Sequence, residues 1–544
     1  MIQPDRPLFT YQTRLSTDAG RDALLDAYAA LYGKAERSLF AALRAGSTVN
    51  DLKRAFLPRF GLTARQFNAI RVGLDGKIAS IKERRPEMIS EMEARIKKAG
   101  KVIAKLEKRV QESNKLHQKK RRLAALQARC KALKADHQAD AVRLCFGSRK
   151  LFRAQFDLDA NGYAEHAEWK RDWEASRSSQ FFVLGSRDEL SGNQTCQALI
   201  SEDGSLTLRL RLPDAMTYQG KIIDIPDVRF AYGHDSIMAA LSRSRRIPST
   251  TKSGKPVVKR TGSAINYRFV RDEKGWRVFA SVEAQEIKAT TSRLVGAVGV
   301  DINVDQLAIS ETDRFGNLTK AWRLDLPIYG KTADQAKALI GDACVALATK
   351  AKSVGKPVVI EDLNFQRKKA EMEAIDPRQA RALSSFACNK VVSGLKAACF
   401  RAGVEVIEVN PAYTSVIGAV NHAQAKGISV HMGAAYAIAR RGLGFSERPT
   451  VRQAIVPTRN GGHVTFDLPA RNRSKHVWSF WSDAGKRLKA AHAAHYRSGE
   501  AKAKPAPLTP ATRSVCSLRS LPAKSRYANR DQHCSDHVLD DVPW

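Results

Sequence analysis

The chain has 544 residues, 43% of them hydrophobic, so at roughly 100–200 residues per domain it can form about two to four domains with packed cores. Lysine and arginine outnumber aspartate and glutamate by 91 to 55, and the net charge of +36 favours a polyanionic partner, with nucleic acid ahead of an anionic membrane surface. A run of about 18 apolar residues, an apolar signal core and a paired CxxC motif are all missing. We therefore expect a cytoplasmic chain with reduced cysteines and no transmembrane helix.

The first 145 residues combine one strand with a long helical stretch. Residues 8–15 alternate polar and apolar positions, whereas apolar residues in 18–145 recur every three or four positions, as one helix face requires. Thr63 is expected to cap a helix, and the composition of 81–142 predicts long helices in an antiparallel hairpin. The most basic part of this hairpin either contacts phosphate or forms a solvated helix face. Its candidate nucleic-acid-binding residues are Lys119, Lys120, Arg121 and Arg122.

Short strand-like segments separated by turns follow in 146–293. They predict a small β-barrel or open sheet, and the strand at 8–15 is expected to join it, which makes the helices an insertion. Residues 242–260 contain seven basic residues and no acid, with Gly, Pro and Ser among them, and are expected to form a mobile basic loop. The candidate nucleic-acid-binding residues in this loop are Arg243, Arg245 and Arg246.

Strands and helices alternate from 294 to 497. Three strands that form an antiparallel meander are followed by helix, strand, helix, strand and helix, which is the element order of the RNase H fold. Residues 498–544 contain five prolines and no periodicity, so we expect a mostly disordered tail. Three residues of the tail could bind a metal: His533, Cys534 and His537. Because the tail has no paired CxxC motif, a chance cluster is favoured over a metal site.

Acidic residues in the third region stand at the ends of apolar strands. Alternation places Asp301, Asn303 and Asp305 on one face of the first strand, and Glu361 ends a strand expected to lie parallel beside it. Two carboxylates that meet there repel each other unless a cation bridges them, and Mg²⁺ or Mn²⁺ suits their oxygens. Two such ions about 3.5–4 Å apart can activate water and stabilise the leaving oxygen of a phosphodiester. Alternatively each acid simply faces water; Asp305 is expected in a turn and Asp362 in a capping role.

Four segments of this region, in order, resemble the RuvC-like nuclease of the TnpB family and of its descendants, the compact type V CRISPR effectors. Within 299–445 they read GVDINVDQLAI, VVIEDLN, VNPAYTSVIG and HMGAAYAIARRGLG. The resemblance implies a multidomain α+β protein in which an RNase H-like (RuvC) α/β nuclease domain is preceded by a β-barrel wedge domain with a helical recognition insertion. The expected parts are a first wedge strand at 1–17, the recognition domain at 18–145, the wedge domain at 146–293, the nuclease domain at 294–497 and the tail at 498–544.

The resemblance also implies an activity and its partners. The family uses a guide RNA to bind target DNA beside a short flanking motif and then cuts that DNA in a metal-dependent reaction. This predicts a transposon- or CRISPR-associated endonuclease that uses Mg²⁺ or Mn²⁺, in the bacterial cytoplasm near the nucleoid, with no membrane partner. A net charge of +36 suits such a load of phosphate.

By this resemblance, Asp301 and Glu361 match the first two catalytic carboxylates and the metal ligands, whereas His431 stands where the family has its third. Imidazole can bind a metal, but it adds no negative charge and is a poorer Mg²⁺ ligand than carboxylate. Asp483 and Glu408 are alternative third acids, and His431 is otherwise a helix N-terminal residue with no metal role. The zinc ribbon of the family is missing because 419–430 contains no cysteine, so no zinc is expected in the nuclease domain.

Further residues match segments of the family that lie near nucleic acid. Tyr413 either contacts the backbone of the nucleic acid or is buried in a turn, and Arg440 and Arg441 either bind phosphate or cap a helix C-terminus. The basic residues after Glu361 resemble the mobile lid of the family; they are Arg367, Lys368 and Lys369. Three hypotheses follow: a guided nuclease, a guided DNA-binding protein that cuts poorly because of His431, and a nucleic-acid-binding transposon accessory protein without a guide.

Overall fold

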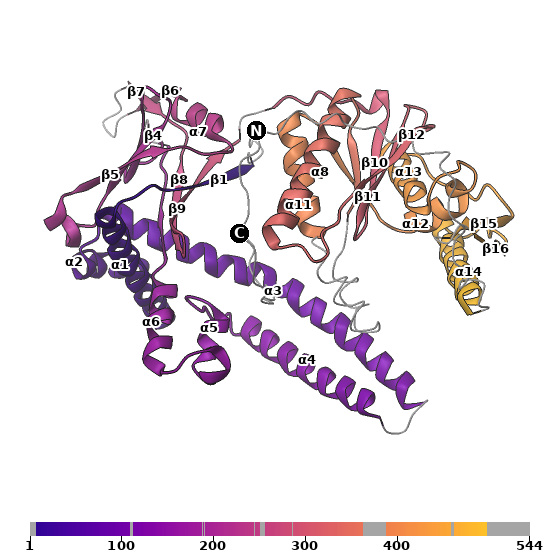
Figure 1. The fold of residues 1–544 in the computed structure, drawn as a ribbon, viewed down its shortest axis with the longest axis horizontal. Coiled ribbons are helices and arrows are strands. Elements are labelled where there is room, and N and C mark those ends of the chain that lie inside the picture. Colours follow the sequence, from indigo (N-terminus) through magenta and orange to yellow (C-terminus); the bar gives the residue numbers. More distant parts are fainter. Residues whose placement is uncertain are drawn as a thin grey trace, which may run out of the picture.

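The computed structural model describes residues 7–108, 113–187, 189, 191–243, 245–250, 256–284, 287–362, 388–458 and 462–497. Figure 1 shows an N-terminal part of helices and sheets, coloured indigo to magenta, and a C-terminal α/β part, coloured orange to yellow. Over these residues no helix has both the length and the apolar character that crossing a membrane requires.

The N-terminal helices form where the three- and four-residue periodicity predicts them. They are α1 (Ala19–Arg44), α2 (Val49–Phe60), α3 (Ala64–Glu107), α4 (Asn114–Gln138), α5 (Arg149–Ala154) and α6 (His166–Arg177). Thr63 caps α3 as expected, because its hydroxyl accepts from the Gln66 N–H at 3.3 Å while the Gln66 side chain accepts from the Thr63 N–H at 2.9 Å. This reciprocal pair is a capping box, and it satisfies two of the four free N–H groups at the start of the helix.

Helices α3 and α4 lie side by side as an antiparallel hairpin (Figure 1). The ion pairs Glu93–Lys134 and Glu107–Lys120 connect the two helices at 2.6 and 2.8 Å. The later residue on α3 pairs with the earlier residue on α4, so the helices run antiparallel. Arg85 closes the base of the hairpin by donating to the carbonyl oxygens of Asp136 and Ala141. The sequence-based prediction of an antiparallel hairpin is therefore confirmed.

The strands of the N-terminal part form separate sheets of four, three and two strands. The four-stranded sheet has the order β1-β9-β8-β2, the three-stranded sheet the order β3-β4-β5, and β6 pairs with β7. Their bounds are β1 (Leu8–Arg14), β2 (Gln180–Val183), β3 (Cys196–Ile200), β4 (Leu206–Arg211), β5 (Ile222–Val228), β6 (Arg245–Thr250), β7 (Pro256–Thr261), β8 (Asn266–Asp272) and β9 (Gly275–Glu283). Strand β1 joins β9 with Leu8 opposite Glu283, so α1 to α6 stand between two strands of one sheet in chain order.

One expectation for this part differs from the structure. The composition of 242–260 predicts a loop, but Arg245 to Thr250 pairs antiparallel with Pro256 to Thr261 as a hairpin. Backbone hydrogen bonding decides this, although the stretch shows no polar–apolar alternation. The described strands of this part form open sheets, which is one of the two alternatives that the sequence leaves, and the β-barrel wedge domain stays a prediction.

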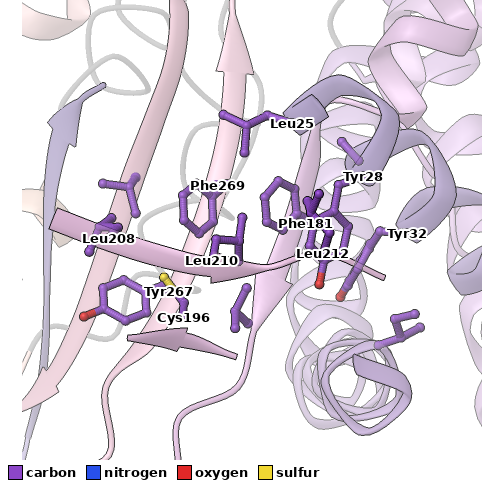
Figure 2. Packing of buried hydrophobic residues seen from close by; sticks show 14 of the residues in the cluster. Leu25, Tyr28, Tyr32, Phe181, Cys196, Leu208, Leu210, Leu212, Tyr267 and Phe269 are labelled. Carbon is purple, nitrogen blue, oxygen red and sulfur yellow. The ribbon is translucent and has the colours of Figure 1, made fainter. Parts of the chain in front are cut away.

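One hydrophobic core joins the N-terminal helices to their sheets. Phe181 of β2 stacks between Tyr28 of α1 and Phe269 of β8, with ring centroids 4.3 and 4.7 Å apart (Figure 2). The leucines of β4 and Leu25 of α1 belong to the same buried cluster. The sheets therefore supply one face of this core and the helices the other.

The C-terminal part is built on a five-stranded sheet of order β12-β11-β10-β13-β14. The strands are β10 (Ala297–Ile302), β11 (Gln306–Thr312), β12 (Leu318–Asp325), β13 (Val358–Glu361) and β14 (Val406–Val409). Strands β10, β11 and β12 pair antiparallel, whereas β13 and β14 run parallel to β10. This is the three-plus-two arrangement that the sequence predicts for an RNase H-like sheet.

Helices cover both faces of this sheet (Figure 1). Val298 and Val300 of β10 pack with residues of α8 (Ala333–Ser353) and α11 (Cys388–Ala402), whereas Ala297 packs with α13 (Val430–Gly442) on the opposite face. Helix α13 approaches β10 so closely that a Cβ on Gly299 would lie 2.0 Å from the Ala435 carbonyl oxygen. Glycine at this position therefore sets the height of α13, and of its first turn, above the sheet.

The remaining elements are divided between the two parts. They are α7 (His234–Leu241), α12 (Thr414–Ile417), β15 (Gln453–Pro457), β16 (His463–Asp467), α14 (Val477–Arg497), the π-helix η4 (Gly418–Ala423) and the short 3₁₀ helices η1 (Asp159–Asn161), η2 (Asp214–Gln219) and η3 (Arg293–Val295). Of these, α7, η1 and η2 lie in the N-terminal part and the others in the C-terminal part. The predicted lid residues and tail cluster lie outside the described residues; they are Arg367, Lys368, Lys369, His533, Cys534 and His537.

Candidate active site

Asp301 and Glu361 stand next to each other at the carboxyl ends of two parallel strands. Val300 of β10 is opposite Ile360 of β13 in a parallel pair. The next residues on the two strands, Asp301 and Glu361, are therefore neighbours. Since Val298, Val300 and Ile360 belong to the core beneath α8 and α11, strand alternation places both carboxylates on the α13 face. The predicted adjacency of the two acids is therefore present in the fold.

The Asp301 carboxylate is buried, with 8% of the residue exposed, and its burial is compensated by hydrogen bonds. The Asn303 amide donates to Oδ2 at 2.9 Å, and His431 Nδ1 lies 3.1 Å from the same oxygen. His431 lies in the first turn of α13, which begins after the cap Ser429. His431 thus contacts Asp301 directly.

The Glu361 carboxylate is held from the other side by the loop after β14. The Thr414 hydroxyl donates to Glu361 Oε1, and Thr414 is 1% exposed. The preceding Tyr413 has φ 63°, a left-handed conformation that is uncommon outside glycine, and it turns the chain into α12. Its half-buried ring makes an edge contact with Trp478 of α14, at 6.2 Å between centroids.

Arg440 and Arg441, at the end of α13, have different surroundings. Arg441 donates to the carbonyl oxygen of Asn410, just past β14. Burial lowers the pKa of Arg441, and Glu361 and Glu447 act in the opposite direction, so its guanidinium lies within electrostatic reach of the site. Arg440 instead binds Glu447 and, at 2.7 Å, the Gly316 carbonyl oxygen, which secures α13 to the β11–β12 turn.

The other candidate acids have separate environments. Asp305 is exposed in the turn after β10, as expected, and exposed Asp362 donates its backbone N–H to the Val409 carbonyl at 2.8 Å. Asp483 and Glu408 are exposed and paired with lysines at 2.8 Å, which are Lys486 and Lys396. Within the part of the chain that the structure describes, no group of three or more His, Cys, Asp or Glu side chains is arranged to hold a metal ion.

The basic candidates of the N-terminal part lie on two separate elements. Lys120, Arg121 and Arg122 are exposed on α4 and Lys119 is half-buried there, while Lys120 pairs with Glu107 at 2.8 Å. Arg243 is half-buried before β6, and the backbones of Arg245 and Arg246 belong to β6. These two groups remain predictions for nucleic-acid contact.

Sequence reasoning misses the hydrogen bonds that hold the two carboxylates. It places Asn303 on the correct face without a role, and it does not single out Thr414. One signal in the sequence could have indicated Thr414. It directly follows Tyr413, at the end of a strand that is expected beside the site.

Comparisons with known proteins give distant structural similarities. Neither a known protein family nor a curated protein matches the sequence. Similar solved structures include Thermus thermophilus RuvC bound to a Holliday junction, with 15% identity, 26% of this chain and 88% of that chain covered, and a TM-score of 0.20. A Cas12f1–sgRNA–target DNA complex has 12% identity, covers 36% and 66%, and has a TM-score of 0.19. A CRISPR-Cas12f ternary complex has 9% identity, covers 80% and 98%, and has a TM-score of 0.19.

Proposed function

We propose that this chain is an RNA-guided DNA-binding protein with a RuvC-like, metal-dependent DNA endonuclease centre. The observation that carries this proposal is the pairing of Asp301 and Glu361 at the carboxyl ends of parallel strands. Ligands of open α/β sheets bind at such strand ends. Two carboxylates side by side in that position make a cation site, because a cation relieves their mutual repulsion.

The donor set suits a hydrated Mg²⁺ or Mn²⁺ ion. Magnesium keeps several waters and is commonly bound by one or two carboxylates together with substrate phosphates, so Asp301 and Glu361 suffice as its protein ligands. A bound ion of this kind would activate water and stabilise the leaving oxygen. Thr414 and Asn303 orient the two carboxylates, and Arg441 supplies positive charge for a phosphate beside Glu361.

Charge and architecture support a guide RNA and target DNA as partners. The net charge of +36 suits a protein that neutralises many phosphates. We assign residues 18–145, with helices α1 to α4, to the recognition domain, residues 1–17 and 146–293, with β1 to β9, to the wedge domain, and residues 294–497 to the nuclease domain. The basic residues of α4 and of the β6 hairpin then contact RNA or DNA backbone.

The contact between His431 and Asp301 favours a second candidate, guided DNA binding with weak or no cleavage. The His431 imidazole, whose Nδ1 lies 3.1 Å from Asp301 Oδ2, takes up space around that oxygen and contributes no negative charge toward a metal. Such a protein would block transcription or support a transposon without breaking DNA. The accessory protein without a guide is the third candidate.

Sequencing the RNA that co-purifies with the full chain tests guide binding. We expect one recurrent structured RNA species with a variable segment, because guided recognition requires a constant scaffold that the protein reads by shape. A heterogeneous pool with the composition of total cellular RNA would contradict guide binding and leave the accessory protein. RNA recovered with an unrelated basic protein of similar net charge serves as the control.

Replacing Thr414 with valine tests the positioning of Glu361. Valine keeps the shape of this buried side chain and removes the hydroxyl that donates to Glu361. We expect Mg²⁺-dependent DNA cleavage to fall about 10- to 100-fold, the range seen when groups that orient metal ligands are removed. Serine, which restores the hydroxyl, should recover most of the rate; equal rates in the valine variant and wild type would contradict the role.

A further inference from the structure

A groove of about 650 Å³ lies where the C-terminal end of α13 meets β14 and the β11–β12 turn, and of its lining residues the proposed function uses Arg441 alone. Its walls come from the β11–β12 turn, η3, β14 and the C-terminal end of α13. The side chains that matter here are Arg293, Leu294, Arg314, Phe315, Glu408 and Arg441. The volume is within the roughly 300–1,000 Å³ of pockets that hold small organic ligands, so a nucleotide unit fits.

Phe315 is an exposed aromatic residue on a rigid turn of this groove, which we call the Phe315 groove. The residue is 62% exposed, and the Arg314 guanidinium lies over its ring at 4.6 Å from the centroid. Asp313 fixes the turn by accepting from the Phe315 and Asn317 N–H groups at 2.9 and 2.8 Å. The turn is also secured to α13, because the Gly316 carbonyl accepts from Tyr436 and from Arg440, both at 2.7 Å.

The charge of the Phe315 groove is positive once its ion pairs are counted. Arg293 pairs with Glu405 at 2.6 Å, and Glu408 pairs with Lys396 at 2.8 Å. These acids are thereby balanced, which leaves the guanidinium groups of Arg314 and Arg441 to set the sign of the groove. Exposed Leu294 adds apolar surface, so cationic groups, an aromatic face and apolar surface occur together.

Arg441 connects this groove to the candidate active site. It lines the groove, donates to the Asn410 carbonyl at the carboxyl end of β14, and is within electrostatic reach of Glu361. A polyanionic strand that reaches the paired carboxylates can therefore continue along β14 to Phe315 with cations beside it.

We propose that the Phe315 groove binds single-stranded nucleic acid that runs along β14 from the candidate active site, with one base stacked on Phe315 at the opposite end of the sheet and phosphates at Arg314 and Arg441. This proposal rests on the proposed function. Base stacking on aromatic rings combined with a cationic groove is the chemistry by which proteins bind single strands without reading sequence. A duplex keeps its base faces inside the stack and offers none to Phe315, so the groove selects single strands over duplex.

Photo-cross-linking tests the placement directly. The full chain, with its co-purified RNA, is irradiated with a 20-nucleotide oligothymidine that contains 5-iodouracil, and the cross-linked peptides are identified by mass spectrometry. We expect a cross-link in the peptide that contains Phe315, and its loss in Phe315→Leu. Cross-links confined to other peptides would overturn the proposal.

Binding affinity provides a second measurement on the same oligonucleotide. Phe315→Ala and Arg314→Ala should each weaken single-strand binding on the order of tenfold and leave a 20-base-pair duplex unaffected. Phe315→Tyr, which keeps the aromatic face, should bind as wild type does. Tyr329→Ala is the matched control, since Tyr329 is also exposed and aromatic in the same α/β part but lies outside the groove. Equal single-strand affinity of wild type and Phe315→Ala would overturn the proposal.

The two proposals can fail separately. If DNA cutting depends on Asp301 but no cross-link forms at Phe315, the groove proposal fails and the nuclease proposal stands. If the cross-link forms but no DNA is cut by wild type, the nuclease proposal fails and the groove still binds a single strand.

Discussion

Replacing Asp301 with asparagine should reduce Mg²⁺-dependent DNA cleavage by about 10³-fold or more. Asparagine keeps the shape of the side chain, but it removes one of the two negative charges that hold the cation. A loss of about 10³-fold corresponds to about 4 kcal/mol of transition-state stabilisation, which is in the range that a bound metal supplies. Guide RNA binding and target DNA binding should stay within about twofold of wild type, because the charge of the whole chain hardly changes.

Asp305→Asn is the matched control for this experiment. Asp305 lies four residues further along the chain and is exposed in the turn after β10. Its replacement with asparagine changes the net charge by the same amount as Asp301→Asn. Cleavage by this variant should equal that of wild type. Cutting by Asp301→Asn at the wild-type rate, with the metal present, would show that the nuclease centre is elsewhere or that the activity belongs to a contaminant.

The five-stranded sheet of the C-terminal part is predictable from the sequence because its signals are local. Each strand of 297–325 contains several apolar or β-branched residues and is bounded by a turn, and the parallel strands at 358–361 and 406–409 each have three apolar residues and one glutamate. Parallel strands meet with their carboxyl ends at one edge, so strand order alone is enough to bring Asp301 and Glu361 together.

The hydrogen bonds around these acids are not predictable in the same way. The contact from Thr414 to Glu361 spans 53 positions and depends on the register of β13 against β14. The His431 contact depends on the height and crossing of α13, which are set by glycine at 299. Neither the register nor the crossing leaves a periodic signal in the sequence.

In the basic stretch 242–260, the sequence predicts a loop where the structure has paired strands. Its glycine, prolines and serines favour a loop, yet six residue pairs from Arg245–Thr261 to Thr250–Pro256 align as a hairpin. Backbone pairing satisfies the N–H and C=O groups of both segments, and this gain does not depend on side-chain alternation. Pro248 and Pro256 are tolerated because a two-stranded ribbon leaves an outer edge without ladder bonds.

Replacing His431 with aspartate should increase DNA cleavage if the missing third carboxylate limits the reaction. An added carboxylate beside Asp301 strengthens the field that attracts Mg²⁺, and oxygen is the ligand that this ion prefers. We expect cleavage at limiting Mg²⁺ to rise about tenfold, since about 1.4 kcal/mol of added stabilisation is sufficient for that gain. At saturating Mg²⁺ the difference between variant and wild type should become smaller.

The same variant should reveal the metal through its stability, independently of any cutting. His431 Nδ1 lies 3.1 Å from Asp301 Oδ2 in the native chain, so aspartate there replaces a favourable contact with repulsion between like charges. Without divalent ions we expect His431→Asp to lower Tm by about 2–4 °C for each kcal/mol lost, and Mg²⁺ to restore it, because an ion that binds the folded state stabilises it. His431→Asn, which adds no charge, should show neither the larger Mg²⁺ response nor the faster cleavage. If aspartate gives no Mg²⁺-dependent rise in Tm beyond that of wild type, position 431 does not face a metal, and weak cleavage must have another cause.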